Sequence, residues 1–301
     1  MSTGRDAAVR TRTCPVCGAA VLPVGEVPSQ YSGRTFSLAR CSTCSYTFVT
    51  NPRTDFAAIY DDAYYSGSGA DPLVDYEREM DDPRTVRIYE WQGVVDAVAS
   101  LTELSPRTRW LDYGGGLGGL VRYVDETIGC DVVGFDEGYG IDRMRDRGIP
   151  HVTRAELDER DGSFDVVTAI EVIEHVCDPV DMLRDVRRVL APGGIVFLTT
   201  GNAAPHRDDL SRWSYAGVPD VHVGFFEPPT LAAALEAAGL EVVWPGFVPG
   251  LDQVIRYKVL KTARVHRRNS LERLVPWRSF TRLVDSRYRT SAMPAGRRPR
   301  D

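Results

Sequence analysis

Short apolar runs alternate with longer helical stretches after residue 105, and this alternation constrains the fold more than any other feature of the chain. A strand, helix, strand succession within one sheet forms right-handed βαβ units. The sequence therefore predicts an α/β protein with a mostly parallel sheet, helices on both faces and a main domain at residues 106–250. The predicted strands cover residues 109–111, 131–135, 164–170, 194–200 and 240–244.

A glycine-rich loop follows the first predicted strand. Gly114, Gly116 and Gly119 satisfy the GxGxxG spacing of nucleotide-binding loops, but tight turns also select glycine, so the pattern alone is weak. Asp112 lies two residues before the loop, where it would repel a pyrophosphate and attract the ammonium group of a methionine moiety. Asp136 ends the next strand, where a carboxylate can bind both hydroxyls of a ribose. Asp112 favours S-adenosylmethionine (SAM) over NAD, whereas Asp136 would suit any adenosine ligand.

Four segments carry a family resemblance: Trp110–Gly118, Val133–Asp136, Phe164–Val176 and Leu190–Gly194. Together they resemble the class I SAM-dependent methyltransferases. Glu171–Pro179 is especially similar to the branch that includes the ubiquinone-pathway O-methyltransferases. The resemblance implies an enzyme with a Rossmann-like, seven-stranded sheet whose last strand is antiparallel.

The same resemblance implies a set of cofactor-binding residues. Gly114, Gly116 and Gly118 would border the methionine part of SAM, Asp136 the ribose, and Ile170 the adenine through its backbone, while Asp112 is added because of its charge. Thr153–Glu156 departs from the common Gly-Asp-Ala pattern of the family, and Ala155 and Glu156 stand at that position. The implied set is Asp112, Gly114, Gly116, Gly118, Asp136, Ala155, Glu156 and Ile170.

Four of the six cysteines form two CxxC pairs near the N-terminus. Cys14 and Cys17 form the first pair, and Cys41 and Cys44 the second. Two such turns supply the four thiolates of a tetrahedral structural zinc site, with a β-hairpin between them. A redox CxxC would instead be a single pair at the start of a helix. We therefore predict a zinc ribbon at residues 1–50.

The segment between the ribbon and the main domain is rich in tyrosine. The zinc ribbon, an Asn-Pro and the text Tyr60–Gly67 together are similar to the N-terminal layout of sugar C-methyltransferases and related natural-product enzymes. In those enzymes tyrosines of this segment line the substrate pocket, so Tyr64 and Tyr65 are candidates; the alternative is a lid that packs its aromatic rings on the core. Apolar residues recur at helical spacing over residues 76–104. Residues 51–105 are therefore predicted to be a tyrosine-rich lid with a leading helix.

Two histidines are candidate general bases. A hydroxyl or carbon acceptor must lose a proton, whereas a neutral amine need not. His222 lies in a loop expected to face the acceptor, with Asp220 as its orienting acid; the alternative is packing at a helix start. His175 follows the strand at 164–170 near the cofactor, where it is either a packing residue or a catalytic one.

Charge divides the chain into an acidic body and a basic end. The net charge is -6, but residues 251–301 carry 14 basic and 4 acidic residues, a net of +10. We expect a basic helical extension and tail there, either solvated or facing an anionic partner. No apolar run approaches the roughly 20 residues of a membrane span, so we expect a cytoplasmic protein.

Three functions fit these features. The first is methylation of a small molecule, most directly a sugar or a natural product, at oxygen or carbon. The sugar C-methyltransferases have a further C-terminal domain that 301 residues cannot hold, so the similarity supports sugar chemistry more than carbon as the acceptor. The second is methylation of an RNA base, although the ribbon lacks the interleaved basic and aromatic residues of nucleic-acid modules. The third is a SAM-binding regulatory protein without turnover, against which the intact glycine loop counts.

Overall fold

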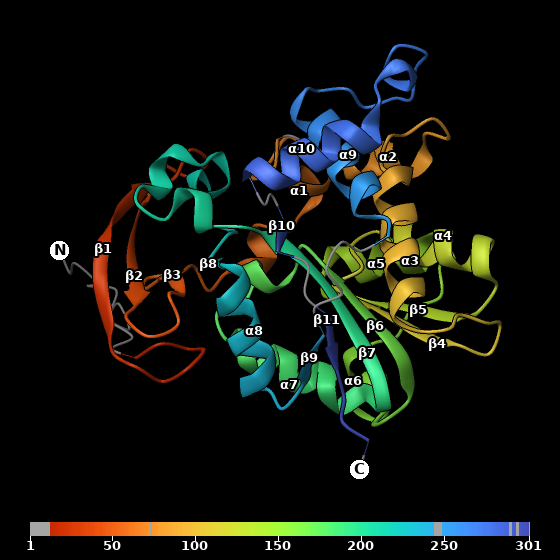
Figure 1. The fold of residues 1–301 in the computed structure, drawn as a ribbon, viewed down its shortest axis with the longest axis horizontal. Coiled ribbons are helices and arrows are strands. Elements are labelled where there is room, and N and C mark those ends of the chain that lie inside the picture. Colours follow the sequence, from red (N-terminus) through yellow and green to blue (C-terminus); the bar gives the residue numbers. More distant parts are fainter. Residues whose placement is uncertain (1–12, 73, 244–248, 289–290, 293–294, 301) are drawn as a thin grey trace.

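The centre of the molecule is a seven-stranded sheet (Figure 1). The computed structural model describes residues 13–72, 74–243, 249–288, 291–292 and 295–300. Six strands follow the order β5-β4-β6-β7-β11-β9, and β10 pairs with β7 beside this path. Neighbouring strands among β5, β4, β6 and β7 pair in parallel, whereas β11 is antiparallel to both of its neighbours. The strands are β4 (Arg109–Tyr113), β5 (Asp131–Phe135), β6 (Phe164–Ile170), β7 (Leu190–Gly201), β9 (Glu241–Val243), β10 (Ser291–Ala292) and β11 (Ala295–Arg297).

Helices cover both faces of this sheet, as predicted. Adjacent strand residues such as Trp110 and Leu111 point to opposite faces and belong to two separate hydrophobic cores. One core is shared with α6 (Arg154–Asp158), α7 (Pro179–Val189) and α8 (Pro228–Ala237). The other is shared with α3 (Ile88–Leu101), α4 (Gly119–Ile128), α5 (Tyr139–Asp146) and α9 (Leu251–Thr262).

The N-terminal ribbon is a second, antiparallel sheet. Its strands are β1 (Val21–Pro28), β2 (Thr35–Cys41), β3 (Thr47–Val49) and β8 (Gly224–Phe225). The β1–β2 hairpin lies between the two CxxC pairs, as expected. Strand β8 comes from the loop after β7, and it pairs Phe225 with Thr47 and Gly224 with Phe48. The ribbon is therefore joined to the main domain by backbone pairing as well as by side-chain packing.

The segment before α3 is the one for which the sequence predicts a lid, and we call it the lid below. It contains a 3-10 helix η1 (Phe56–Ala58), then α1 (Asp62–Tyr65) and α2 (Tyr76–Asp81). The helix predicted over residues 76–104 is in fact two helices, because Pro83 interrupts it. Asp82, the residue before the proline, has extended backbone angles, in keeping with the steric effect of a following proline.

The C-terminal region is largely helical up to residue 288, as predicted, but the end of the chain joins the main sheet where a tail was predicted. After α9 the chain forms the 3-10 helix η6 (Glu272–Leu274) and α10 (Trp277–Tyr288), and β11 then enters the sheet between β7 and β9. Arg298 fastens this end: its guanidinium donates to the carbonyl of Leu190 at 2.6 Å, and its backbone N–H to that of Gly194 at 2.9 Å. Among the described helices, none is long and apolar enough to span a bilayer.

Candidate active site

The glycine loop between β4 and α4 has the conformation expected of a cofactor cradle. Gly114, Gly116 and Gly118 all have positive φ, a region that suits glycine. A Cβ atom at Gly114 would lie 2.5 Å from a methyl group of Val172, so any side chain there would clash with the segment after β6. A Cβ at Gly116 would meet only the ring of Tyr65, at 3.9 Å. The loop backbone is therefore open toward the lid and closed on its other side.

Two carboxylates flank this loop: Asp112 is buried and Asp136 is half-buried. Asp112 accepts a hydrogen bond from the Thr168 hydroxyl at 2.8 Å, and burial raises the pKa of Asp112 to about 7. Asp136 accepts from the backbone N–H groups of Gly116 and Glu137, both at 2.7 Å, and burial raises the pKa of Asp136 to about 6. No salt bridge joins either acid to a described cation. The acids therefore fit a ligand that offers an ammonium group to the first and hydroxyl groups to the second.

The remaining predicted cofactor residues lie at the edges of this region. Ile170 is the last residue of β6 and is half-buried. Ala155 and Glu156 are exposed in the first turn of α6. The Glu156 carboxylate accepts from the backbone N–H of Thr153 at 2.7 Å and closes a capping box. The structure thus gives Glu156 a helix-capping contact.

Tyrosines of the lid cover the glycine loop. Tyr65 is buried and stacks on Tyr139, with ring centroids 5.0 Å apart. The Tyr139 hydroxyl lies 2.9 Å from the Asp62 carboxylate and 3.1 Å from that of Glu77, and its one proton can be donated to either. Tyr64 is also buried and packs among neighbouring tyrosine rings. Tyr64 therefore packs within the lid, Tyr65 lies over the cofactor loop, and a substrate-lining role for the pair stays a prediction.

Glu174, His175 and His222 form a compact polar cluster next to the loop. One ligand atom from each residue lies within 4.8 Å of the other two, so the cluster could hold a metal ion. Glu174 is fully buried, and burial raises its pKa to about 8, with Glu171 adding to the effect. Burial lowers the pKa of His175 to about 4 and that of His222 to about 3. Both imidazoles are therefore neutral at physiological pH.

Backbone carbonyls fix the tautomers of the two histidines. His222 Nδ1 lies 2.7 Å from the carbonyl oxygen of Tyr215, and His175 Nδ1 lies 3.0 Å from that of Val221. A carbonyl accepts only, so each Nδ1 must carry the proton, and each Nε2 has a free lone pair. His175 Nε2 lies 3.8 Å from the Glu174 carboxylate. The cluster thus offers basic nitrogen atoms close to a carboxyl group.

Asp220 does not orient His222, which corrects the sequence-based prediction. Its fully buried carboxylate accepts a hydrogen bond from the Ser29 hydroxyl and lies 3.6 Å from Arg53 Nη1. Ser29 directly follows β1, so Asp220 links the ribbon to the loop that carries His222. The carbonyl of Tyr215, rather than a carboxylate, fixes the His222 ring.

Three residues that surround this cluster were not predicted from the sequence: Tyr60, Tyr215 and Lys258. The Tyr60 hydroxyl lies 2.9 Å from His175 Nδ1, beside the Val221 carbonyl that accepts from the same N–H. Tyr215 stacks on His222 at 3.8 Å between centroids and donates its hydroxyl to Glu174. Lys258 of α9 lies 3.0 Å from Glu171, the residue that follows β6 with a φ of 56°. Tyr60 belongs to the Tyr60–Gly67 segment that carries the resemblance, whereas no motif around Lys258 indicated a place near this cluster.

The four predicted zinc ligands converge at one end of the ribbon. Cys14 Sγ lies 3.5 Å from Cys44 Sγ, Cys17 Sγ lies 3.4 Å from Cys41 Sγ, and all four sulfur atoms lie within 4.8 Å. Sulfur atoms around a tetrahedral zinc ion lie about 3.8 Å apart, given Zn–S bonds of about 2.3 Å. Burial acts to raise the pKa of Cys41, but N–H groups of Cys44 and Thr43 outweigh it and lower the pKa to about 7. This donor set fits zinc.

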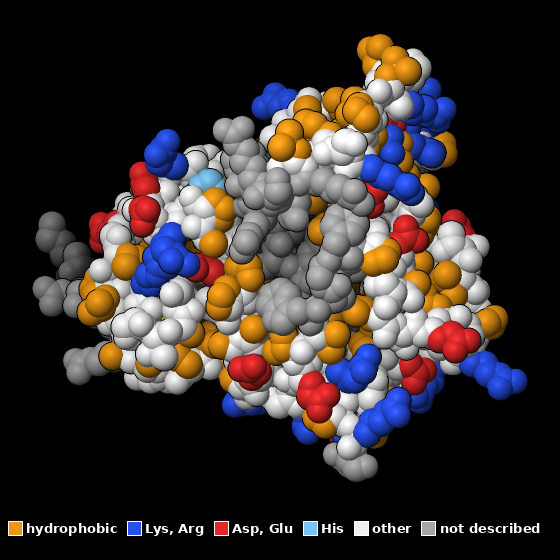
Figure 2. Space-filling view, in the orientation of Figure 1, with side chains coloured by type: hydrophobic (Ala, Val, Ile, Leu, Met, Phe, Trp, Pro, Cys, Tyr) orange, Lys and Arg blue, Asp and Glu red, His pale blue; other side chains and the backbone are white. Residues whose placement is uncertain are grey.

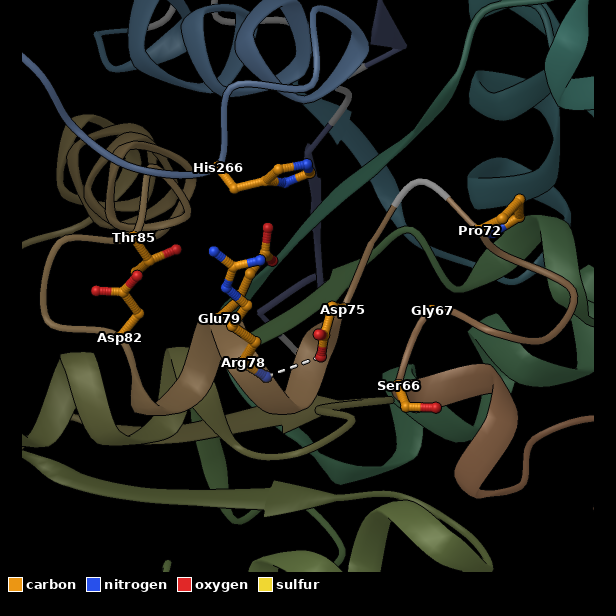
Figure 3. Close-up of a pocket in the computed structure, with 9 residues that line it drawn as sticks. All are labelled: Ser66, Gly67, Pro72, Asp75, Arg78, Glu79, Asp82, Thr85 and His266. Atoms are coloured by element: carbon orange, nitrogen blue, oxygen red, sulfur yellow. Dashed lines mark hydrogen bonds between the residues drawn. The ribbon is translucent and has the colours of Figure 1, made fainter.

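A small cavity of about 120 Å³ separates the lid from the loop after α9 (Figure 3). Its polar lining includes Arg78, Glu79 and His266, and the Arg78 backbone N–H donates to Asp75 at 2.9 Å. Sites for ligands of drug size usually occupy about 300 to 1,000 Å³. This cavity is too small to be the acceptor site.

Comparison with known proteins agrees with this geometry. A family described as a methyltransferase domain matches residues 84–244, more than half of the chain. The chain belongs to this methyltransferase family. The matched residues contain the glycine loop, both acids and the polar cluster, and they exclude the ribbon. The prediction of a class I SAM-dependent methyltransferase is confirmed, and the protein is an enzyme of that class.

Curated proteins similar to this methyltransferase include O-methyltransferases and an N-methyltransferase. A ubiquinone biosynthesis O-methyltransferase of Pseudomonas aeruginosa is 29% identical over 51% of this chain and 79% of its own length. One from Ruegeria pomeroyi is 35% identical over 45% of this chain and 60% of its own length. A glycine/sarcosine/dimethylglycine N-methyltransferase of Actinopolyspora halophila is 32% identical, but the match covers only 21% of that protein.

Solved structures share the fold of this methyltransferase. A methyltransferase in complex with the Haloferax volcanii Trm112 activator superimposes with a TM-score of 0.52 at 18% identity, over 82% of this chain and 99% of that one. Haemonchus contortus phosphoethanolamine N-methyltransferase 2 gives a TM-score of 0.53 at 14% identity, over 82% of this chain and 61% of that one. At these identities the likeness concerns the fold alone.

Proposed function

We propose that this methyltransferase transfers the methyl group of SAM to a hydroxyl group or an acidic carbon of a small molecule, such as a nucleotide-linked sugar, a glycoside or a natural product. The observation that carries the proposal is the convergence of Glu174, His175 and His222 next to the cofactor loop. Such a cluster suits an acceptor that must lose a proton. The ubiquinone-pathway O-methyltransferases among its relatives are consistent with a hydroxyl acceptor.

Some of these residues would bind the cofactor, and others would transfer the proton. Asp112 would hold the ammonium group of SAM, Asp136 its ribose, and Tyr65 would cover the site and exclude water. The bound sulfonium supplies an electrophilic methyl group. His222 Nε2 would accept the proton of the acceptor hydroxyl, whose oxygen would take the methyl group as the methyl–sulfur bond of SAM breaks. Burial lowers the pKa of His222 to about 3 and raises that of Glu174 to about 8. Glu174 would therefore have to lose its own proton before it could stabilise the imidazolium that forms.

The ribbon has an architectural part in this proposal. The four cysteines would hold a structural zinc ion and thereby stabilise the hairpin of β1 and β2. The core next to the cysteines is shared with the main domain, since the Tyr46 ring lies 4.7 Å from that of Phe226. The Thr230 hydroxyl of α8 also donates to the carbonyl of Cys44 at 2.7 Å. Zinc would therefore fix the ribbon on the loop that carries His222.

Labelled SAM and a panel of nucleotide sugars, glycosides, phenolic compounds and RNA would test the acceptor class. Methyl transfer to RNA alone would overturn the proposal. With an acceptor in hand, His222→Ala should lower the single-turnover rate by about 10² to 10⁴ and leave SAM affinity near that of the unmodified enzyme. His175→Ala should also weaken SAM binding, because His175 contacts Tyr60 of the lid. His206→Ala is the matched control: His206 lies in the same loop but stacks on Trp213. Full activity of His222→Ala would remove this residue from the mechanism.

A further inference from the structure

A projecting surface of the C-terminal region exposes large apolar side chains. Seven large hydrophobic side chains are exposed in the described part of the chain, and four of them lie between residues 271 and 283. Leu271 is 75% exposed and Leu274 is 79% exposed, both around η6, and Phe280 follows on α10. Figure 2 shows hydrophobic side chains at the tip of the region that contains α9 and α10, with basic side chains beside them.

The same surface is strongly basic. Residues 263–283 contain six arginines and one acidic residue, Glu272. Glu272 is buried and pairs with Arg256, so it does not offset the charge at the surface. Arg264, Arg273 and Arg278 are exposed and form no salt bridge with any described residue. We call the exposed set the C-terminal surface: Arg264, Leu271, Arg273, Leu274, Arg278 and Phe280.

Buried contacts hold this surface in place from behind. The Glu272 side chain points inward, where it accepts a hydrogen bond from the Tyr89 hydroxyl at 2.8 Å. Trp277 Nε1 donates to the Glu272 carbonyl at 2.7 Å, and the Arg256 guanidinium lies 5.1 Å from the Trp277 ring. Because Glu272 is anchored inward, its neighbours Leu271 and Arg273 are presented outward. The exposure of the leucines therefore follows from a fixed local fold.

We propose that the C-terminal surface docks on a membrane that contains anionic lipids. Exposed leucine and phenylalanine side chains gain free energy by entering the boundary between headgroups and acyl chains, and arginines gain it from anionic headgroups. RNA would pair with the arginines but would leave the leucines in water. The same surface of a second copy would present the same positive charge and be repelled. The combination of aliphatic tips and unpaired arginines thus matches a lipid surface.

Sedimentation with phosphatidylcholine vesicles, with and without phosphatidylglycerol, tests the proposal on the full chain. Binding should require phosphatidylglycerol and weaken as salt rises. Replacing Leu271 and Leu274 by serine should lower the partition coefficient about tenfold for each residue. Replacing Arg273 and Arg278 by alanine should lower it about fivefold for each. The matched control is Leu22→Ser with Val24→Ser, which removes two exposed apolar side chains from β1 and should change nothing.

Three results would overturn the proposal. The first is failure of the unmodified protein to sediment with anionic vesicles at low salt. The second is equal loss of binding in the β1 control pair. The third is that the leucine substitutions change the mass measured by light scattering while vesicle binding is unaltered, which would identify a protein contact. SAM titration of every variant should match the unmodified enzyme, so that the result is independent of the proposed acceptor chemistry.

Discussion

Asp220→Ala should destabilise the whole protein. This outcome would distinguish a structural role, in which Asp220 links the ribbon to the loop that carries His222, from a catalytic role. The Asp220 carboxylate is fully buried between the ribbon and the loop that carries His222. A hydrogen bond to a charged group contributes about 1.5 to 3 kcal/mol, and the Ser29 hydroxyl supplies one. Arg53 adds less, because it lies at 3.6 Å and also pairs with the exposed Asp55. We therefore expect a loss of about 2 to 3 kcal/mol in the free energy of unfolding.

Thermal unfolding followed by fluorescence measures this loss directly. At about 2 to 4 °C per kcal/mol for a chain of 150 to 250 residues, Asp220→Ala should lower the melting temperature by about 4 to 12 °C. Asp220→Asn should lose less, since its amide oxygen can still accept from Ser29. Asp208→Ala is the control, because Asp208 is an exposed acid of the same loop. An unchanged melting temperature combined with a rate loss of 10² or more would refute the linking role and restore Asp220 as a catalytic acid.

The remaining predictions concern the cofactor site and the ribbon. Burial raises the pKa of Asp112 to about 7, and the ammonium group of SAM favours the ionised carboxylate, so SAM binding below pH 7 should release a proton from Asp112. SAM affinity should therefore rise up to tenfold per pH unit as the pH approaches 7. Titrations of Asp112→Asn should show a smaller dependence of SAM affinity on pH. Asp136→Ala should weaken SAM binding by about 1.5 to 3 kcal/mol, which calorimetry would contradict if a folded variant bound normally. Cys14→Ser or Cys41→Ser should release zinc and lower the melting temperature; metal analysis of fresh protein would reject the site if it found no zinc.

Sequence patterns predicted those parts of the fold that are determined by residues close together in the chain. The strands at 109–113, 131–135 and 164–170 each contain adjacent apolar residues that are buried, which suits a sheet covered on both faces. The CxxC pairs and the glycine loop were visible because each motif needs specific residues at fixed spacing. Pro83 was also visible in the sequence, and the unbroken helix predicted across it was an error of interpretation.

Long-range pairing explains what the sequence did not reveal. Strand β11 is only Ala295–Arg297, too short for a strand pattern, and it pairs with strands about 50 and 100 residues earlier in the chain. Strand β8 has two residues and forms only because β3 of the ribbon offers an edge. The contact between Asp220 and Ser29 spans 191 positions. Sequence spacing placed Asp220 near His222, but only the tertiary fold shows that its carboxylate is used by the ribbon.

The ribbon and the polar cluster are connected through one continuous set of backbone hydrogen bonds. The N–H of Val49, at the end of β3, donates to the carbonyl of Val223 at 2.9 Å, and the N–H of Val223 donates to the carbonyl of Glu174 at 2.8 Å. Gln30, after β1, donates its backbone N–H to Gly217 of the same loop, also at 2.9 Å. None of these bonds involves the glycine loop. Loss of the ribbon fold should therefore disturb the position of His222 relative to Glu174 while the cofactor loop keeps its own contacts, so the N-terminal module acts on the acceptor side of the site.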